Sequence, residues 1–141
     1  MSQVKGLCVL DVDGTLILEE VIDLLGREAG HEAEISQITS RAMRGELVFE
    51  SSLRKRVSLL EGLPIISPQV KKETLEKWRK KLKLSKERTV AIGDGVNNLL
   101  MLKSAELGIA FCSKEMLKKE IPHHVDKRDF LEVLPLIDCL E

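Results

Sequence analysis

Three short apolar runs constrain the fold of this chain more than any other feature of its sequence. They span Gly6 to Leu10, Thr89 to Ile92 and Leu107 to Phe111. Each run is nearly continuous in apolar residues, which is typical of a parallel strand buried on both faces. The segments between and after them show helical spacing of apolar residues instead. Strands that alternate with helices predict an α/β fold with a parallel sheet.

The long stretch after the first run contains no further strand candidate until residue 89. Between residues 17 and 66, glycines divide the sequence into segments of about a dozen residues with helical spacing. We therefore predict a helical insertion at residues 17–66, placed after the first strand, and an α/β core formed by residues 1–16 and 67–141. A lysine-rich helix is expected over Val70 to Leu84 at the start of the second core segment.

Composition and charge exclude several classes of protein. The chain has 141 residues, 43% of them apolar, with 22 basic and 23 acidic residues, so no global positive field favours nucleic acid or anionic lipid. No run approaches the roughly 20 apolar residues that span a bilayer. The three widely spaced cysteines suggest buried or half-buried thiols rather than disulfides or zinc. We expect a cytoplasmic protein with no nucleic-acid or membrane partner.

Acidic residues follow the first two apolar runs directly. The first run ends in Asp-Val-Asp-Gly-Thr-Leu, which places Asp11 and Asp13 on the same side of an extended chain. Two carboxylates about 4 Å apart repel by roughly 4 kcal/mol at an effective dielectric constant near 20. The second run ends in Gly-Asp-Gly-Val-Asn-Asn, so Asp94 is expected at the same sheet edge. Each acid alone is explained as a helix-capping turn residue, whereas the three together predict a site for a hard cation such as Mg²⁺.

This pair of motifs resembles the first and fourth motifs of the haloacid dehalogenase-like hydrolases, and the closer resemblance is to their phosphoserine phosphatase branch. The resemblance implies that Asp11 attacks phosphorus to form an aspartyl-phosphate. It implies that Asp13 protonates the leaving alcohol and later activates water. Magnesium would be held by the Asp11 carboxylate, the Asp13 backbone carbonyl and Asp94.

The resemblance also implies a lysine and a set of substrate contacts. Lys71, with Lys72 as its alternative, matches the lysine that balances the charge of a phosphate dianion. Arg56 would grip the substrate carboxylate with two hydrogen bonds, and Glu20 would pair with the amino group. The residues implied to contact substrate are Glu20, Met43, Phe49, Arg56 and Asn97.

Two departures from the family pattern have consequences. Only residues 57–70 separate Arg56 from Lys71, which leaves no room for the family's second strand, its serine and its crossover helix; Ser67 is a poor substitute. The fold predicted is therefore a truncated Rossmann-like parallel sheet of about three strands with a helical cap insertion. The first strand would become an apolar edge, so we expect the protein either to form a homodimer or to be marginally stable. In addition, Asn98 replaces an aspartate that supports the metal site.

Two functions follow from these observations. The first is a magnesium-dependent phosphomonoester hydrolase of phosphoserine phosphatase type that acts on a small phosphorylated substrate. The alternative is a catalytically degenerate relative that binds a small amino-acid-like ligand or a partner chain. The retained acids and lysine favour the first, and the missing serine strand and Asn98 favour the second.

Overall fold

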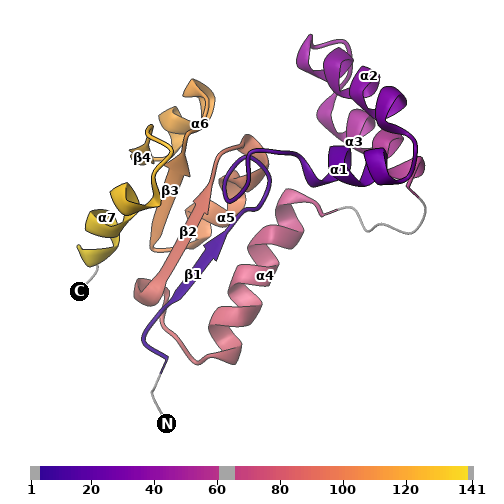
Figure 1. Ribbon diagram of the computed structural model, residues 1–141. Coiled ribbons are helices and arrows are strands. Elements are labelled where there is room, and N and C mark those ends of the chain that lie inside the picture. The colour runs from indigo at the N-terminus through magenta and orange to yellow at the C-terminus, as the bar shows by residue number, and fades with distance from the viewer. Residues whose placement is uncertain (1–3, 61–65, 140–141) are drawn as a thin grey trace. The chain divides into compact units, whose positions relative to one another are not determined.

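The protein folds into two compact units, which are described separately. The structure, a computed structural model, describes residues 4–60 and 66–139, apart from the side chains of Met43 and Phe49. The first unit combines residues 1–17 with residues 66–141, and the second spans residues 18–65 (Figure 1). No helix in the described parts of the chain is both long and apolar enough to cross a membrane.

The first unit contains a parallel sheet of four strands in the order β1-β2-β3-β4. The strands are β1 (Leu7–Leu10), β2 (Thr89–Gly93), β3 (Leu107–Phe111) and β4 (His123–Val125). The α/β class and the three apolar strands are confirmed, but the expected strand count of about three is too low. Strand β4 has only three residues, of which the two histidines are exposed, so it lacks the apolar run by which the others are recognised.

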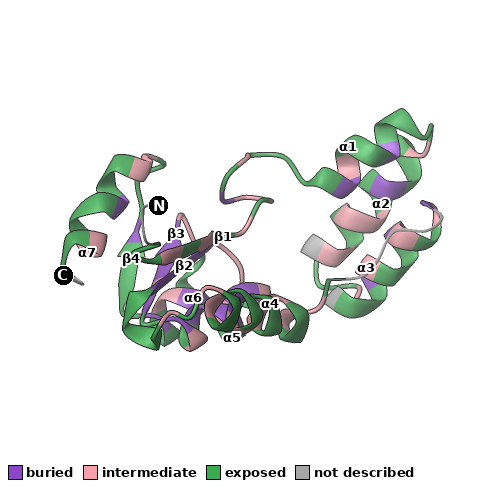
Figure 2. Cartoon of the chain, turned by 90° about the horizontal axis from the view of Figure 1, so that it is seen from below, coloured by how far each residue is buried: buried purple, intermediate pink, exposed green. Residues whose placement is uncertain are grey.

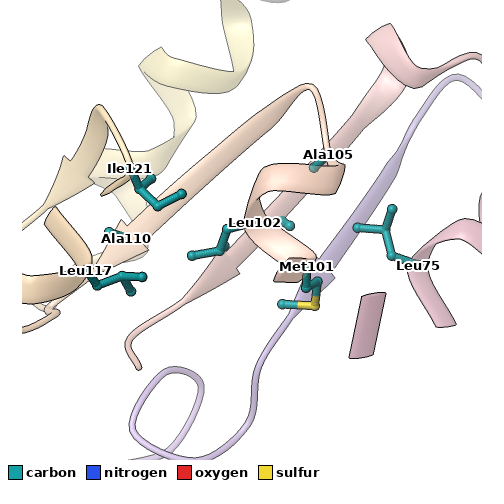
Figure 3. Packing of buried hydrophobic residues seen from close by; sticks show 8 residues of the cluster. Leu75, Met101, Leu102, Ala105, Ala110, Leu117 and Ile121 are labelled. Carbon is teal, nitrogen blue, oxygen red and sulfur yellow. The ribbon is translucent and has the colours of Figure 1, made fainter. Parts of the chain in front are cut away.

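Helices cover the two faces of this sheet unequally. On one face lie α4 (Pro68–Lys81), α5 (Leu99–Ser104) and α6 (Glu115–Glu120), and on the other lies α7 (Leu134–Asp138), as Figure 2 shows. Short 3₁₀ helices span Lys86–Arg88, Val96–Asn98 and Phe130–Val133. The core under α4, α5 and α6 is seen in Figure 3 and consists of Leu75, Ala91, Met101, Leu102, Ala105, Ala110, Leu117 and Ile121.

Strand β1 is an edge strand with one uncovered face. It pairs only with β2, with Cys8 opposite Val90 and Leu10 opposite Ile92. Val90 and Ile92 are buried in the cluster beneath α7, whereas Cys8 and Leu10 on the same face of β1 are exposed. The prediction that this strand is buried on both faces is therefore wrong, because no helix described in the first unit covers β1 on that side.

The cysteines also differ from expectation. Cys8 and Cys139 are exposed, and only Cys112 is half-buried; all three are free thiols.

The second unit is a small helical bundle. It contains α1 (Val21–Glu28), α2 (Glu32–Met43) and α3 (Phe49–Ser58), and its core is formed by Ile22, Ile35 and Leu60. A Cβ atom on Gly26 would lie 2.4 Å from Cδ1 of Ile35, so glycine at this position lets α1 pack closely on α2. Residues 61–65, part of the segment in which the family's second strand was judged absent, lie outside the described residues.

Candidate active site

The carboxyl ends of β1 and β2 bring two acidic residues to one edge of the sheet. The two strands are in register, and the Asp11 amide continues the ladder by donating to the Ile92 carbonyl at 2.9 Å. Asp94 follows β2 directly. Gly14 packs on this acid so closely that a Cβ atom there would lie 2.5 Å from Asp94 Oδ2. With φ of +68°, Gly14 also occupies a backbone region that favours glycine.

Lys71 reaches this edge from the first turns of α4. Its Nζ donates to Asp11 Oδ1 at 2.7 Å and to Asn98 Oδ1 at 3.0 Å. The Lys71 and Asp11 side chains are only 16% and 12% exposed, so solvent screens this ion pair weakly. Lys72, the alternative, instead lies 3.9 Å from Glu76 on the helix surface. Ser67 caps the helix by accepting from the Val70 amide.

Asn98 connects the lysine to the second acid. Its side chain is fully buried, accepts from Lys71, and donates through Nδ2 to Asp94 Oδ1 at 3.5 Å. Gly93 makes this position possible, because a Cβ atom there would lie 2.7 Å from the Cβ and Cγ atoms of Asn98. An asparagine can accept and donate at once, which an ionised aspartate cannot do.

Asp94 has a perturbed carboxyl group. Burial raises its pKa above the ordinary value, and the nearby Asp11 carboxylate raises it further. Hydrogen bonds from the Asp94 backbone amide and the Thr15 hydroxyl lower this pKa, and the positive charge of Lys71 also lowers it. The Thr15 hydroxyl donates to Asp94 Oδ1 at 3.4 Å and is itself buried. Thr15 belongs to the first motif, but its sequence position alone indicated no role; the available signal was a hydroxyl two residues after Asp13.

The donor set fits a hard cation. The described residues contain no group of three or more His, Cys, Asp or Glu side chains that could hold a metal ion. The set implied by the family needs only two carboxylates, from Asp11 and Asp94, together with the Asp13 backbone carbonyl. Burial is the main reason that the pKa of Asp94 is raised, and the negative charge of Asp11 adds to it; a bound Mg²⁺ would offset both effects.

The predicted substrate contacts are spread over both units. Asn97 belongs to the first unit and folds its side chain over Gly95, where Oδ1 would lie 2.4 Å from an added Cβ. Glu20 is exposed at the N-cap position of α1. Arg56 is only 6% exposed, and its Nη1 donates to Thr39 Oγ1 at 3.3 Å. The side chains of Met43 and Phe49 lie outside the described part of the structure, so their predicted roles stay predictions.

Comparisons with known proteins identify the family to which the chain is similar. Residues 31–128 match the family of haloacid dehalogenase-like hydrolases. A phosphoserine phosphatase of Lactococcus lactis is 32% identical over 209 aligned positions, which cover 96% of this chain and 97% of the relative. A solved substrate-bound phosphoserine phosphatase complex superposes with a TM-score of 0.77 at 31% identity, over 96% of this chain and all of that one. A phospho-aspartyl intermediate analogue of phosphoserine phosphatase gives a TM-score of 0.75 at 32% identity, over 94% and 99%.

The alignment with the Lactococcus relative also shows a difference in length between the proteins. It runs over 209 positions, whereas this chain has 141 residues, so the relative contains residues that this chain lacks. This agrees with the missing strand and crossover helix inferred from the short spacing between Arg56 and Lys71. With its motifs, its parallel sheet and these matches taken together, the chain belongs to the haloacid dehalogenase-like hydrolases, in the phosphoserine phosphatase branch.

Proposed function

We propose that this chain is a magnesium-dependent phosphomonoester hydrolase that acts on phosphoserine or a similar small phosphate through an aspartyl-phosphate. The observation that carries the proposal is the contact of 2.7 Å between Lys71 Nζ and Asp11 Oδ1 at the carboxyl end of β1. A half-buried ammonium beside an anionic nucleophile lowers the repulsion that an incoming phosphate dianion would otherwise meet.

The first step transfers the phosphoryl group to the protein. An Asp11 carboxylate oxygen attacks phosphorus, and the bond between phosphorus and the ester oxygen breaks with its electron pair on that oxygen. The Asp13 carboxylic acid gives its proton to the leaving oxygen, which departs as an alcohol. Lys71 stays paired with the phosphoryl oxygens and with Asn98.

The second step restores the free protein. The Asp13 carboxylate takes a proton from water, and the water oxygen attacks phosphorus. The acyl phosphate bond breaks, so that Asp11 returns to its carboxylate form and inorganic phosphate leaves. When Mg²⁺ is bound by Asp11, Asp94 and the Asp13 carbonyl, it supplies positive charge that stabilises the phosphoryl oxygens.

The cap residues would select an amino-acid substrate. Arg56 is buried, and its Nε has no hydrogen-bond partner among the residues that the structure describes. A buried guanidinium with an unused donor is costly unless a ligand pairs with it, and a carboxylate is the best match for its planar fork. Glu20 would pair with the substrate amino group, and Met43, Phe49 and Asn97 would complete the contacts.

The test is phosphate release from L-phosphoserine by the purified full chain, with and without Mg²⁺. We expect turnover that needs Mg²⁺ and disappears in Asp11→Asn. Arg56→Gln is expected to raise KM for phosphoserine while leaving KM for phosphoethanolamine, which has no carboxylate, unchanged. Equal turnover by wild type and Asp11→Asn would overturn the assignment of the nucleophile.

The second candidate is a degenerate relative that binds without turnover. It is favoured by the absence of the serine motif strand and by Asn98 in place of an acid. Calorimetry with L-serine and L-phosphoserine separates the two candidates. Binding of either ligand without phosphate release would support the degenerate relative and exclude the hydrolase.

We further propose a homodimer formed through the edge of β1. The Asp11 amide points toward β2, and backbone groups alternate in direction along a strand, so the amides and carbonyls of Cys8 and Leu10 point away from β2. A second copy of β1 in antiparallel orientation would satisfy these groups and cover two exposed apolar side chains.

Light scattering at increasing protein concentration tests this assembly. We expect a dimer for wild type and a monomer for Cys8→Lys, which places a charge on the edge. Met116→Lys, which changes a 67% exposed residue of α6, is the matched control and is expected to stay dimeric. A wild-type monomer that folds cooperatively at all concentrations would refute the proposal.

A further inference from the structure

The loop that follows Asp13 is held by an arginine from the far end of the chain. Arg128, located between β4 and the 3₁₀ helix Phe130–Val133, is 114 residues from Gly14 in sequence. Its Nη2 donates to the Gly14 carbonyl at 2.8 Å, and its Nη1 donates to the Thr15 carbonyl at 3.4 Å. The planar guanidinium therefore spans two successive carbonyls of one loop, and all of these residues belong to the first unit.

The loop itself explains why these carbonyls need an outside donor. The amides of Thr15, Leu16 and Ile17 all donate to the Val12 carbonyl, at 3.3, 2.9 and 3.0 Å. This is a single tight turn, so its later carbonyls do not continue into a helical ladder. The positive φ of Gly14 also prevents the turn from extending as a regular helix. Arg128 supplies the donors that a further helical turn would have supplied.

The Arg128 side chain also contacts the core of the first unit. Its guanidinium lies over the ring of Phe111, with Cζ 5.8 Å from the ring centroid. Phe111 is fully buried at the end of β3 and stacks on Phe130, with a centroid distance of 4.5 Å and an interplanar angle of 9°. Since this aromatic pair belongs to the packed face under α7, it gives the guanidinium a support that is independent of the loop.

The loop is thus fixed from two directions. The Thr15 side chain donates to Asp94, and the Thr15 and Gly14 carbonyls accept from Arg128. Asp13 precedes Gly14 directly, so any shift of the turn moves both its carboxyl and its carbonyl.

We propose that Arg128 is a positioning residue, which holds the turn so that Asp13 can deliver a proton to the leaving oxygen. This inference rests on the proposed function, but the contact itself is testable without it.

The kinetic test compares Arg128→Ala and Arg128→Lys with a matched arginine variant. Arg79 donates through Nη1 to the Leu84 carbonyl at 3.1 Å, so Arg79→Ala removes the same kind of bond at the other end of α4 from Lys71. We expect Arg128→Ala to lower kcat about tenfold or more with KM for phosphoserine within about threefold, because misplacing an acid affects the transition state. Arg128→Lys should recover part of kcat, and Arg79→Ala should stay within about twofold of wild type.

A second measurement does not depend on activity. Hydrogen–deuterium exchange of the full chain, followed by mass spectrometry, reports the amides of Thr15, Leu16 and Ile17 through the peptide that contains them. Arg128→Ala is expected to speed their exchange about tenfold, and Arg79→Ala is expected to leave it unchanged. If wild type releases no phosphate, the proposed function fails, but faster exchange in Arg128→Ala still supports the positioning contact. Unchanged exchange in that variant, or a kcat equal to that of Arg79→Ala, would overturn the inference.

Discussion

Replacing Asn98 by aspartate tests the electrostatics of the site most directly. A carboxylate at this position would face Lys71 Nζ at about 3.0 Å and Asp94 Oδ1 at about 3.5 Å, if it keeps the amide geometry. At an effective dielectric constant near 20, the attraction is about 5.5 kcal/mol and the repulsion is about 4.7 kcal/mol. Because these terms nearly cancel, the cost of desolvating a carboxylate at this fully buried position is not offset, and Asn98→Asp should destabilise the metal-free protein.

Bound Mg²⁺ is expected to favour the added carboxylate. An ion bound to Asp94 Oδ1 at the usual distance of about 2.1 Å would lie within roughly 6 Å of the nearest atom at position 98. One added negative charge at about 6 Å attracts a divalent ion by about 1.4 kcal/mol even at the dielectric constant of water. We therefore expect Asn98→Asp to bind Mg²⁺ at least about tenfold more tightly than wild type.

Isothermal titration calorimetry with MgCl₂ alone measures this change without any substrate. The matched control is Gln37→Glu, which makes the same amide-to-acid change at an exposed position of α2. Its Mg²⁺ affinity is expected to stay within about twofold of wild type. Equal affinities for Asn98→Asp and wild type would refute the reasoning, because position 98 would then lie outside the influence of the ion.

Three further outcomes are expected. Asp11→Asn should abolish phosphate release while the melting temperature changes by only a few degrees, since the lost ion pair with Lys71 offsets the relieved repulsion between acids; scanning fluorimetry checks the second part. Lys71→Ala should lose turnover in the phosphate assay, whereas Lys72→Ala should keep it within about twofold. Gly14→Ala should destabilise the fold by more than the roughly 1 kcal/mol expected for Gly30→Ala in urea titrations, because both glycines have positive φ but only Gly14 lacks space for a Cβ atom. Equal losses of stability would exclude the steric term.

The sequence was sufficient to predict the edge of the sheet at which the acids meet. Asp11 and Asp94 each follow an apolar run directly, and parallel strands end at the same edge. The strands are predicted from continuous apolar runs, and the position of each acid is predicted from its place directly after a run. Both are local patterns in the sequence. Register then follows because the runs are similar in length and are buried by the same helices, as with Val9 and Ala91 in the cluster under α4 and α5.

Features that depend on absent or distant neighbours were not predictable in the same way. The apolar run of β1 matches a strand buried on both faces, but Cys8 and Leu10 are exposed because that side is not covered by any helix described in the first unit. Strand β4 is formed by hydrogen bonds to β3 and not by apolar content, so His123 and His124 gave no strand signal. The exposure of β1 and the formation of β4 both depend on which element lies alongside. The residues next to each strand in the sequence do not contain that information.

The apolar pattern of α4 does not distinguish Lys71 from Lys72. Leu75 is the buried residue of α4, and it lies four positions after Lys71 and three after Lys72. Helical neighbours at both spacings share a face, so the apolar pattern assigns both lysines to the inner side equally well. The two lysines differ in their distant contacts. Lys71 bonds to Asp11, which is 60 residues away in sequence, and to Asn98, which is 27 residues away. Lys72 instead lies near Glu76 of its own helix, which is a local contact within α4. The lysine that contacts Asp11 and Asn98 is therefore determined by the packing of α4 against β1, which the apolar pattern of α4 alone does not contain.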